Sequence, residues 1–298
     1  MSYSVAVAGT TNHTLLYAQA LLEHAKFEIS LIITPEAKPI GRKQLLTPNP
    51  IQKFADSNQI PIVLIKNRVD ESVKNKILAH RKPDFLLVVD FGYLVPKWLL
   101  DLPKIMPINI HPSALPKWRG SSPAQFVLLT GEKTSAISII QMTSQFDQGP
   151  IIWQQQFEVD QDWTQTEYYQ HSFQLATQNL ATVMLQLTEK SISPTPQTTA
   201  SPTPLAHRLT KQDAFITWVK LTQAMTTDQK IATQLERASR AYSPWPLLWT
   251  KIQTNKGQRR MQIISTKLNQ TGLLNLEKVK IEGMPVKPWQ EVKNVVKN

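Results

Sequence analysis

The chain of 298 residues contains no cysteine and only nine glycines. Without cysteine, disulfide scaffolds, thiol nucleophiles, cysteine-ligated zinc sites and iron–sulfur clusters are excluded. The loop at Gly9 has one glycine where a dinucleotide-binding fingerprint needs three, and no Gly-x-x-x-x-Gly-Lys phosphate loop occurs. The common glycine motifs for nicotinamide cofactors and ATP are therefore missing.

Long apolar runs are missing as well. No stretch approaches the roughly 18 residues needed to span a bilayer, and the N-terminal residues lack the basic region of a signal peptide. No His-x-x-x-His pair occurs among the six histidines, which are His13, His24, His80, His111, His171 and His207. We therefore expect a soluble cytoplasmic protein that needs no metal.

Positive charge exceeds negative charge by 11, and the excess is unevenly distributed. Residues 207–298 hold 16 Lys and Arg against 6 Asp and Glu, whereas residues 1–206 are nearly balanced. Between them, residues 191–204 carry four prolines, seven Ser or Thr and no charge, a composition typical of a solvated linker. We expect a domain at 1–190, a Ser/Thr/Pro linker at 191–206 and a basic domain at 207–298. Its charge indicates either a nucleic-acid partner or solubility alone.

The first domain alternates apolar, β-branched runs with helix-patterned stretches. This pattern predicts a doubly wound, mostly parallel α/β sheet covered on both faces. The expected strands are Ser4–Ala8, Ile29–Thr34, Ile62–Ile65, Phe85–Val89, Pro107–Ile110 and Ala136–Met142. The expected helices are Leu15–Ala25, Ile51–Ser57, Asp70–His80 and Ala124–Thr130.

The basic domain has a different pattern. After a helical stretch near Thr227–Ala241, short strand-like runs at Leu247–Gln253, Met261–Thr266 and Val279–Glu282 are separated by polar turns. Such a series predicts a small β-barrel.

The chemically informative residues follow the predicted strand that ends at Ile110. Asn109 and His111 are two residues apart and so project from the same face of that strand, at the edge where α/β sheets hold ligands. An amide can donate to a developing oxyanion and an imidazole can carry a proton, a pair suited to acyl transfer. Asp147, in a turn-rich loop, either orients the imidazole or is an ordinary turn residue.

These segments resemble the enzymes that use 10-formyltetrahydrofolate as formyl donor. The resemblance rests on Asn-Ile-His-Pro-Ser-Ala-Leu-Pro at 109–116 and Phe-Asp-Gln-Gly at 146–149, and it extends through residues 39–43, 82–96 and 241–246. Within this superfamily the match is closest to the methionyl-tRNA formyltransferases. It implies a Rossmann-like formyltransferase domain followed by an OB-like domain that binds tRNA. Separately from the resemblance, we expect a monomer that does not associate with membranes.

The resemblance also implies roles for individual residues. Asn109, His111 and Asp147 would be catalytic and transfer the formyl group to the α-amine of initiator methionyl-tRNA. The folate pocket would be lined by Ser113, Ala114, Leu115, Pro116, Val89, Asp90, Phe91, Gly92, Tyr93 and Leu94. The tRNA would be bound by Lys38, Arg42 and Lys43 of the proline-rich loop 34–50 and by Arg237, Arg240, Lys251, Arg259 and Arg260.

The sequence departs from the family pattern at several places. Ala114 stands where the family usually has Leu, and Gln44 follows Lys43 where a basic residue is usual. Thr11-Asn12-His13 stands where the family usually has Pro-x-Phe, and Asp90-Phe91 stands where it usually has Ala-Tyr. Asp90 would therefore add a carboxylate beside the pterin pocket, or it could point away from that pocket.

Two other functions are consistent with these residues. Formyltransferases for other amines, such as 4-amino sugar nucleotides, and formyltetrahydrofolate hydrolases would share the same three catalytic side chains. A catalytically inactive RNA-binding protein is the second alternative. The basic loop and the basic second domain favour tRNA as the acceptor.

Overall fold

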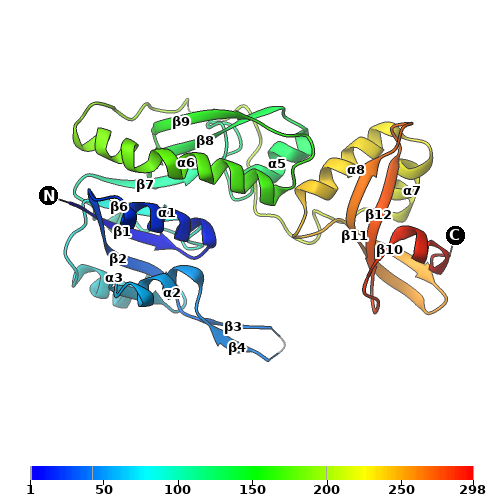
Figure 1. Ribbon diagram of the computed structural model, residues 1–298, viewed down its shortest axis with the longest axis horizontal. Coiled ribbons are helices and arrows are strands. Elements are labelled where there is room, and N and C mark those ends of the chain that lie inside the picture. Colours follow the sequence, from blue (N-terminus) through cyan, green and yellow to red (C-terminus); the bar gives the residue numbers. More distant parts are fainter. Residues whose placement is uncertain (1, 42, 199, 298) are drawn as a thin grey trace. The chain divides into compact units, whose positions relative to one another are not determined.

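The computed structural model describes residues 2–41, 43–198 and 200–297 (Figure 1). These residues divide into two compact units. Unit 1 comprises residues 1–119, 136–155 and 172–202, and unit 2 comprises residues 120–135, 156–171 and 203–298.

A seven-stranded sheet is the framework of the first part of the chain. Its strands are β1 (Tyr3–Gly9), β2 (Phe27–Pro35), β5 (Ile62–Ile65), β6 (Phe85–Val89), β7 (Met106–His111), β8 (Thr134–Gln141) and β9 (Ile151–Glu158). They lie in the order β5-β2-β1-β6-β7-β8-β9. The pairs from β5 to β7 are parallel and β8 runs antiparallel to β7. The predicted doubly wound, mostly parallel sheet is confirmed.

Helices α1 (Asn12–Glu23), α2 (Pro50–Ser57) and α3 (Glu71–Leu78) each begin at a capping side chain and bury an apolar face. Thr11, Asn49 and Asp70 accept backbone hydrogen bonds at the starts of these helices. Helices α4 (Lys97–Leu100) and α6 (Gln165–Thr188) follow later in the chain. The core of unit 1 includes Ala6, Ile33, Ile65, Leu86 and Leu99.

The order of the strands determines where a ligand can approach. The chain leaves β1 toward β2 on one side of the sheet and continues through β6 and β7 on the other side. The reversal therefore lies between β1 and β6, and ligands of such sheets bind beyond the carboxyl ends of the strands at this point. The loops after β1, β6 and β7 all begin at that edge.

The expected strands and helices of the first domain are present, but five elements among the described residues escaped the sequence prediction. These are strand β9, the short helix α4, the long helix α6 and the two strands of a hairpin, β3 (Lys38–Ile40) and β4 (Leu45–Thr47), within the proline-rich loop. Figure 1 shows this hairpin projecting from the sheet of unit 1. Its turn sequence is polar and its strands are three residues long, so no alternating pattern marked it.

Unit 2 contains a second sheet. Its strands β10 (Trp249–Thr254), β11 (Gly257–Leu268), β12 (Leu274–Ile281) and β13 (Val286–Pro288) are antiparallel and follow one another in that order. Helices α5 (Pro123–Thr130), α7 (Trp218–Thr226) and α8 (Gln229–Ala241) belong to the same unit, and α9 (Trp289–Val292) and η1 (Lys293–Val295) end the chain. The strands predicted for a small barrel thus form a four-stranded antiparallel sheet.

The segment at 191–204 is exposed along much of its length, yet it is attached to unit 1. Ile151 and Thr195 exchange two backbone hydrogen bonds of 2.8 Å. The compact units also interleave segments along the chain, instead of dividing it once at this point. The division into a catalytic domain, a linker and an OB-like domain therefore stays a prediction about function. Across the described residues, no helix combines the length and the apolar character that crossing a membrane requires.

One polar cluster joins the amino ends of β1 and β6. Asp84 accepts hydrogen bonds from the backbone nitrogen and the hydroxyl of Ser4, both at 2.8 Å, and from the Lys104 ammonium at 3.0 Å. Burial raises the pKa of Asp84, but these donors outweigh it and hold that pKa below its ordinary value.

We predict that Asp84→Ala lowers the free energy of unfolding at neutral pH by about 1–3 kcal/mol, because the Ser4 donors lose a charged acceptor. A depressed carboxylate pKa contributes stability above the pKa of the unfolded state, and this contribution is lost as the pH falls through the pKa of the folded state. The difference between variant and wild type, measured by urea unfolding, should therefore shrink on acidification below about pH 4. A difference that stays constant over that range would contradict the assignment.

Candidate active site

The end of strand β7 presents the predicted pair. Asn109 is half-buried and His111 is 4% exposed. Register pairs Asn109 with Val88 of β6 and His111 with Ser138 of β8, so both side chains are carried by rigid, paired backbone. The sequence prediction of a shared strand end is thus matched by the structure.

The His111 ring is hydrogen-bonded at one nitrogen and faces a carboxylate at the other. Nε2 lies 3.0 Å from the carbonyl oxygen of Trp118. Because a carbonyl can only accept, Nε2 carries a proton, and Nδ1 is left as the basic nitrogen of the neutral ring. The carboxylate oxygen Oδ2 of Asp147 lies 3.7 Å from Nδ1. A proton taken up at Nδ1 would therefore be stabilised by a negative charge beside it.

Asp147 reaches His111 from the connection between β8 and β9. It is 7% exposed and its backbone is in the left-handed region, with φ of 52°. Side chains other than glycine rarely adopt this conformation, so the surroundings must hold it. Two residues later the backbone of Gly149 passes so close to the carbonyl oxygen of Gln141 that a β-carbon there would lie 1.7 Å from it. The turn that carries Asp147 is thus closely packed.

Hydrogen bonds within the turn and from strands β8 and β9 hold the predicted folate-binding turn after β7. The Ser113 hydroxyl donates to the carbonyl of Lys117 at 2.7 Å, and Ser138 donates to the carbonyl of Ser113 at 2.7 Å. Leu115 is buried, and its carbonyl accepts from Gln154 at 3.1 Å. Ala114 and Pro116 are half-buried, so these two residues are accessible from outside the turn.

The second predicted folate-binding segment continues from β6 and combines buried and exposed residues. Val89 and Phe91 are buried, and Tyr93 packs against Phe91 with ring centroids 5.5 Å apart. Gly92 is exposed with φ of 77°, and Leu94 is 86% exposed. The buried residues anchor the loop, and Gly92 and Leu94 form its accessible tip.

Two of the departures from the family pattern, in the β1–α1 loop and at Asp90, meet each other in the structure. The carboxylate Oδ2 of Asp90 accepts a hydrogen bond from the Thr11 hydroxyl at 2.8 Å and lies 3.0 Å from Nδ1 of His13. The His13 ring packs on Phe173 with centroids 4.3 Å apart. Burial and the Asp90 charge together raise the pKa of Tyr17, in the next turn of α1, well above its ordinary value. Asp90 therefore links the β1–α1 loop to the β6 loop at the reversal of the sheet.

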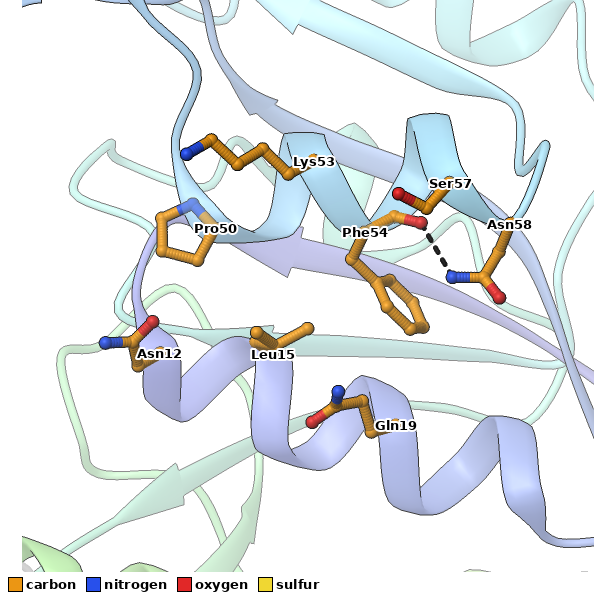
Figure 2. Close-up of a pocket in the computed structure, with 8 residues that line it drawn as sticks. All are labelled: Asn12, Leu15, Gln19, Pro50, Lys53, Phe54, Ser57 and Asn58. Atoms are coloured by element: carbon orange, nitrogen blue, oxygen red, sulfur yellow. Dashed lines mark hydrogen bonds between the residues drawn. The ribbon is translucent and has the colours of Figure 1, made fainter.

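A groove of about 500 Å³ lies between α1 and α2 (Figure 2). Its lining includes Asn12, Leu15, Gln19, Lys53 and Phe54. None of the predicted catalytic residues lines it, because they are carried by β7 and by the β8–β9 connection. Within the described part of the chain, no three His, Asp or Glu side chains gather in a way that could hold a metal ion.

The residues predicted to bind tRNA have unequal surroundings. Arg42 lies outside the described residues, whereas Lys38 and Lys43 are exposed on the β3–β4 hairpin. In unit 2, Arg237 donates to the carbonyl of Thr130 at 3.2 Å. Arg240 is engaged by Glu236 at 2.6 Å and by the carbonyl of Trp163 at 2.8 Å. The last two arginines thus have structural partners within the protein.

Strand register assigns the remaining basic residues to two faces of the second sheet. Arg259 pairs with the buried Ile252 and so lies on the covered face. Arg260 pairs with the exposed Lys251, and its guanidinium stacks on Trp249 at 4.1 Å from the ring centroid. Alternation along β12 adds two exposed lysines that the sequence analysis missed, Lys278 and Lys280. We call Lys251, Arg260, Lys278 and Lys280 the outer basic face.

Comparison with known proteins gives a consistent result. Residues 3–184 match the family described as formyl transferase. The chain is 31% identical over 270 residues to a methionyl-tRNA formyltransferase of Idiomarina loihiensis, covering 89% of this chain and 80% of that protein.

Solved structures with the same fold have different described activities. A methionyl-tRNA formyltransferase from Clostridium thermocellum superposes with a TM-score of 0.60 at 16% identity, covering 94% of this chain and 98% of that one. An N-formyltransferase from Helicobacter canadensis, solved with folinic acid and dTDP-3-aminofucose, gives a TM-score of 0.62 at 16% identity, covering 90% and 88%. At these identities the likeness shows the fold.

We predict that Gly149→Ala displaces the turn that carries Asp147, because the added β-carbon would meet the Gln141 carbonyl. Overpacking of this kind costs about 1–3 kcal/mol. The melting temperature should therefore fall by roughly 2–10 °C for a chain of this size. Ser144→Ala, an exposed change in the same connection, is the matched control and should leave the melting temperature unchanged. Equal melting temperatures for Gly149→Ala and wild type would show that the turn is not closely packed.

Proposed function

The chain belongs to the formyl transferase family, and we propose that it transfers the formyl group of 10-formyltetrahydrofolate to the α-amine of initiator methionyl-tRNA. The product would be the N-formylmethionyl-tRNA used to start translation. The observation that carries the proposal is the pairing of His111 with Asp147 beside Asn109 at the carboxyl end of β7, within the residues that match the family.

The chemistry follows from the side chains. The amine attacks the formyl carbon, and the formyl oxygen gains negative charge as the new C–N bond forms. The Asn109 amide donates a hydrogen bond to that oxygen. His111 accepts the proton released by the amine at Nδ1, where Asp147 stabilises the resulting imidazolium. The C–N bond to the folate nitrogen then breaks, and the proton passes to the leaving tetrahydrofolate. No covalent enzyme intermediate is required.

The donor is proposed to lie between the two loops described above. Ala114 and Pro116 of one loop and Gly92 and Leu94 of the other are the accessible residues of these segments. The Asp90 carboxylate is occupied by Thr11 and His13, which favours a structural contribution from it to the pocket wall.

The acceptor is proposed from charge and from the curated relative. The outer basic face combines four cations with the Trp249 ring, and nucleic acids are bound by this combination of charge and aromatic surface. Two nitrogens of Arg260, Nε and Nη2, are buried and have no hydrogen-bond acceptor among the described residues. In unit 1, Lys38, Arg42 and Lys43 are proposed to contact the acceptor end of the tRNA.

One assay tests the proposal against its alternatives. Purified protein is incubated with 10-formyltetrahydrofolate and methionyl-tRNA, free methionine, a 4-amino sugar nucleotide or no acceptor, and products are identified by mass spectrometry. We expect formylation of the charged tRNA alone. Formylation of the sugar nucleotide, or release of formate without an acceptor, would move the protein to another branch of the family. No turnover would support a binding protein.

We predict that His111→Ala reduces formyl transfer to the charged tRNA by at least about a hundredfold, as expected for loss of a positioned proton acceptor. Affinity for the tRNA should stay within about twofold of wild type in a filter-binding measurement, because His111 is almost fully buried. Equal loss of turnover and of affinity would contradict a role in proton transfer.

We predict that Lys251→Ala and Lys280→Ala each weaken tRNA binding and reduce the slope of log affinity against log salt by about one, as expected for one lost phosphate contact each. Lys76→Ala, an exposed change on α3 in unit 1, is the control and should leave the slope unchanged. If all three variants bind with the wild-type slope, the outer basic face does not contact tRNA.

A further inference from the structure

The turn that carries Asp147 is held from the segment that its composition predicts to be a solvated linker. The pairing of Ile151 with Thr195 aligns this segment antiparallel to the residues that follow the turn. Two positions later, Nε2 of Gln197 donates to the carbonyl oxygens of Asp147 at 3.0 Å and Gly149 at 2.7 Å. Both hydrogens of this amide are thus used on the turn.

A buried arginine fixes the orientation of that amide. Arg119 is 6% exposed. Its Nε and Nη2 donate to Oε1 of Gln197 at 3.1 and 2.8 Å, and Nη2 also donates to the carbonyl of Thr198 at 2.9 Å. Because a guanidinium can only donate, the Gln197 oxygen must face Arg119 and its NH2 group must face the turn. Hydrogen bonds from a charged donor are also the stronger kind.

The two hydrogen bonds from Gln197 hold Asp147 in its left-handed backbone conformation. The two anchored carbonyls belong to Asp147 itself and to the residue two positions after it, so they determine the direction in which the carboxylate projects. A small rotation of this backbone would change the distance of 3.7 Å between that carboxylate and His111. Geometric losses on this scale are costly in active sites.

We propose that Gln197, oriented by Arg119, is a positioning residue for formyl transfer, and that residues 195–198 belong functionally to the active site. The inference rests on the proposed catalytic role of Asp147. It assigns to the segment a function that its low-complexity composition does not suggest. It also gives the buried Arg119 guanidinium a role, which is to orient the Gln197 amide.

Gln197→Glu tests the proposal with a change of similar shape. A carboxylate can still pair with Arg119, but it has no hydrogen to donate to the carbonyls of Asp147 and Gly149. Its second oxygen would face these two carbonyl oxygens and repel them. We expect kcat for methionyl-tRNA to fall by about ten- to a hundredfold while KM for the donor and for the tRNA changes less than about threefold, the pattern of a lost transition-state contribution. Gln197→Met, which keeps the length without donors or charge, should fall in the same range.

A matched control is available elsewhere in the chain. Gln161 donates from Nε2 to the carbonyl of Val159 at 3.0 Å in an exposed connection. Gln161→Glu makes the same chemical change away from the turn, so kcat should be unchanged. Circular dichroism and thermal unfolding of each variant establish that the protein assayed is folded.

A double variant separates positioning from a general structural effect. If Gln197 acts through Asp147, adding Gln197→Glu to Asp147→Asn should lower kcat no further, because residues in one network are not additive. A further fall in proportion to the single variant would overturn the inference. The inference would also be overturned if Gln197→Glu and Gln197→Met kept the wild-type kcat while Asp147→Asn was inactive. That outcome would leave the proposed function intact. Full activity of Asp147→Asn would instead refute the role proposed for Asp147.

Discussion

The contact between His111 and Asp147 is the interaction on which the candidate site depends. The imidazole comes from a central strand and the carboxylate comes from a turn 36 residues later, and both side chains are almost fully buried. Burial of two ionisable groups is costly unless they satisfy each other. The sheet supplies a rigid strand end for one partner, and a strained turn supplies the other. The surrounding contacts, from Trp118 to Gln197, fix these two side chains in place.

The same edge of the sheet shows how two loops far apart in the sequence are joined by one carboxylate. Thr11 and His13 in the first loop and Asp90 in the β6 loop all depart from the family pattern, and in the structure both Thr11 and His13 bind Asp90. The exposure of the His13–Asp90 pair, 34% and 39%, means that its electrostatic contribution to stability is small. Its effect is to join two loops at the reversal of strand order, where a ligand of this fold approaches.

In the second unit, the number of basic residues in the sequence does not show which of them form an exposed basic surface. Residues 207–298 carry most of the excess positive charge of the chain. However, Arg237 and Arg240 have partners within the protein, and Arg259 faces the covered side of its sheet. Register and alternation place Lys251, Arg260, Lys278 and Lys280 on the outer side of the sheet, where the three lysines are exposed and Arg260 is half-buried. Two of these were predicted from the sequence. The other two follow from period-two alternation, which the sequence analysis did not apply to residues 274–281.

The sequence by itself determined six of the seven strands of the first sheet, the helices α1, α2 and α3 and the position of Asn109 and His111, because hydrophobic period and turn residues are local properties. It also indicated the family, since the motifs around these residues are local too. Only the tertiary structure decided that Asp147 lies beside His111, that Asp90 is bound by His13, and that Gln197 holds the turn from 50 residues away. These contacts join residues that are distant in the chain. A local sequence pattern cannot predict them, because the residues come together only when the chain folds.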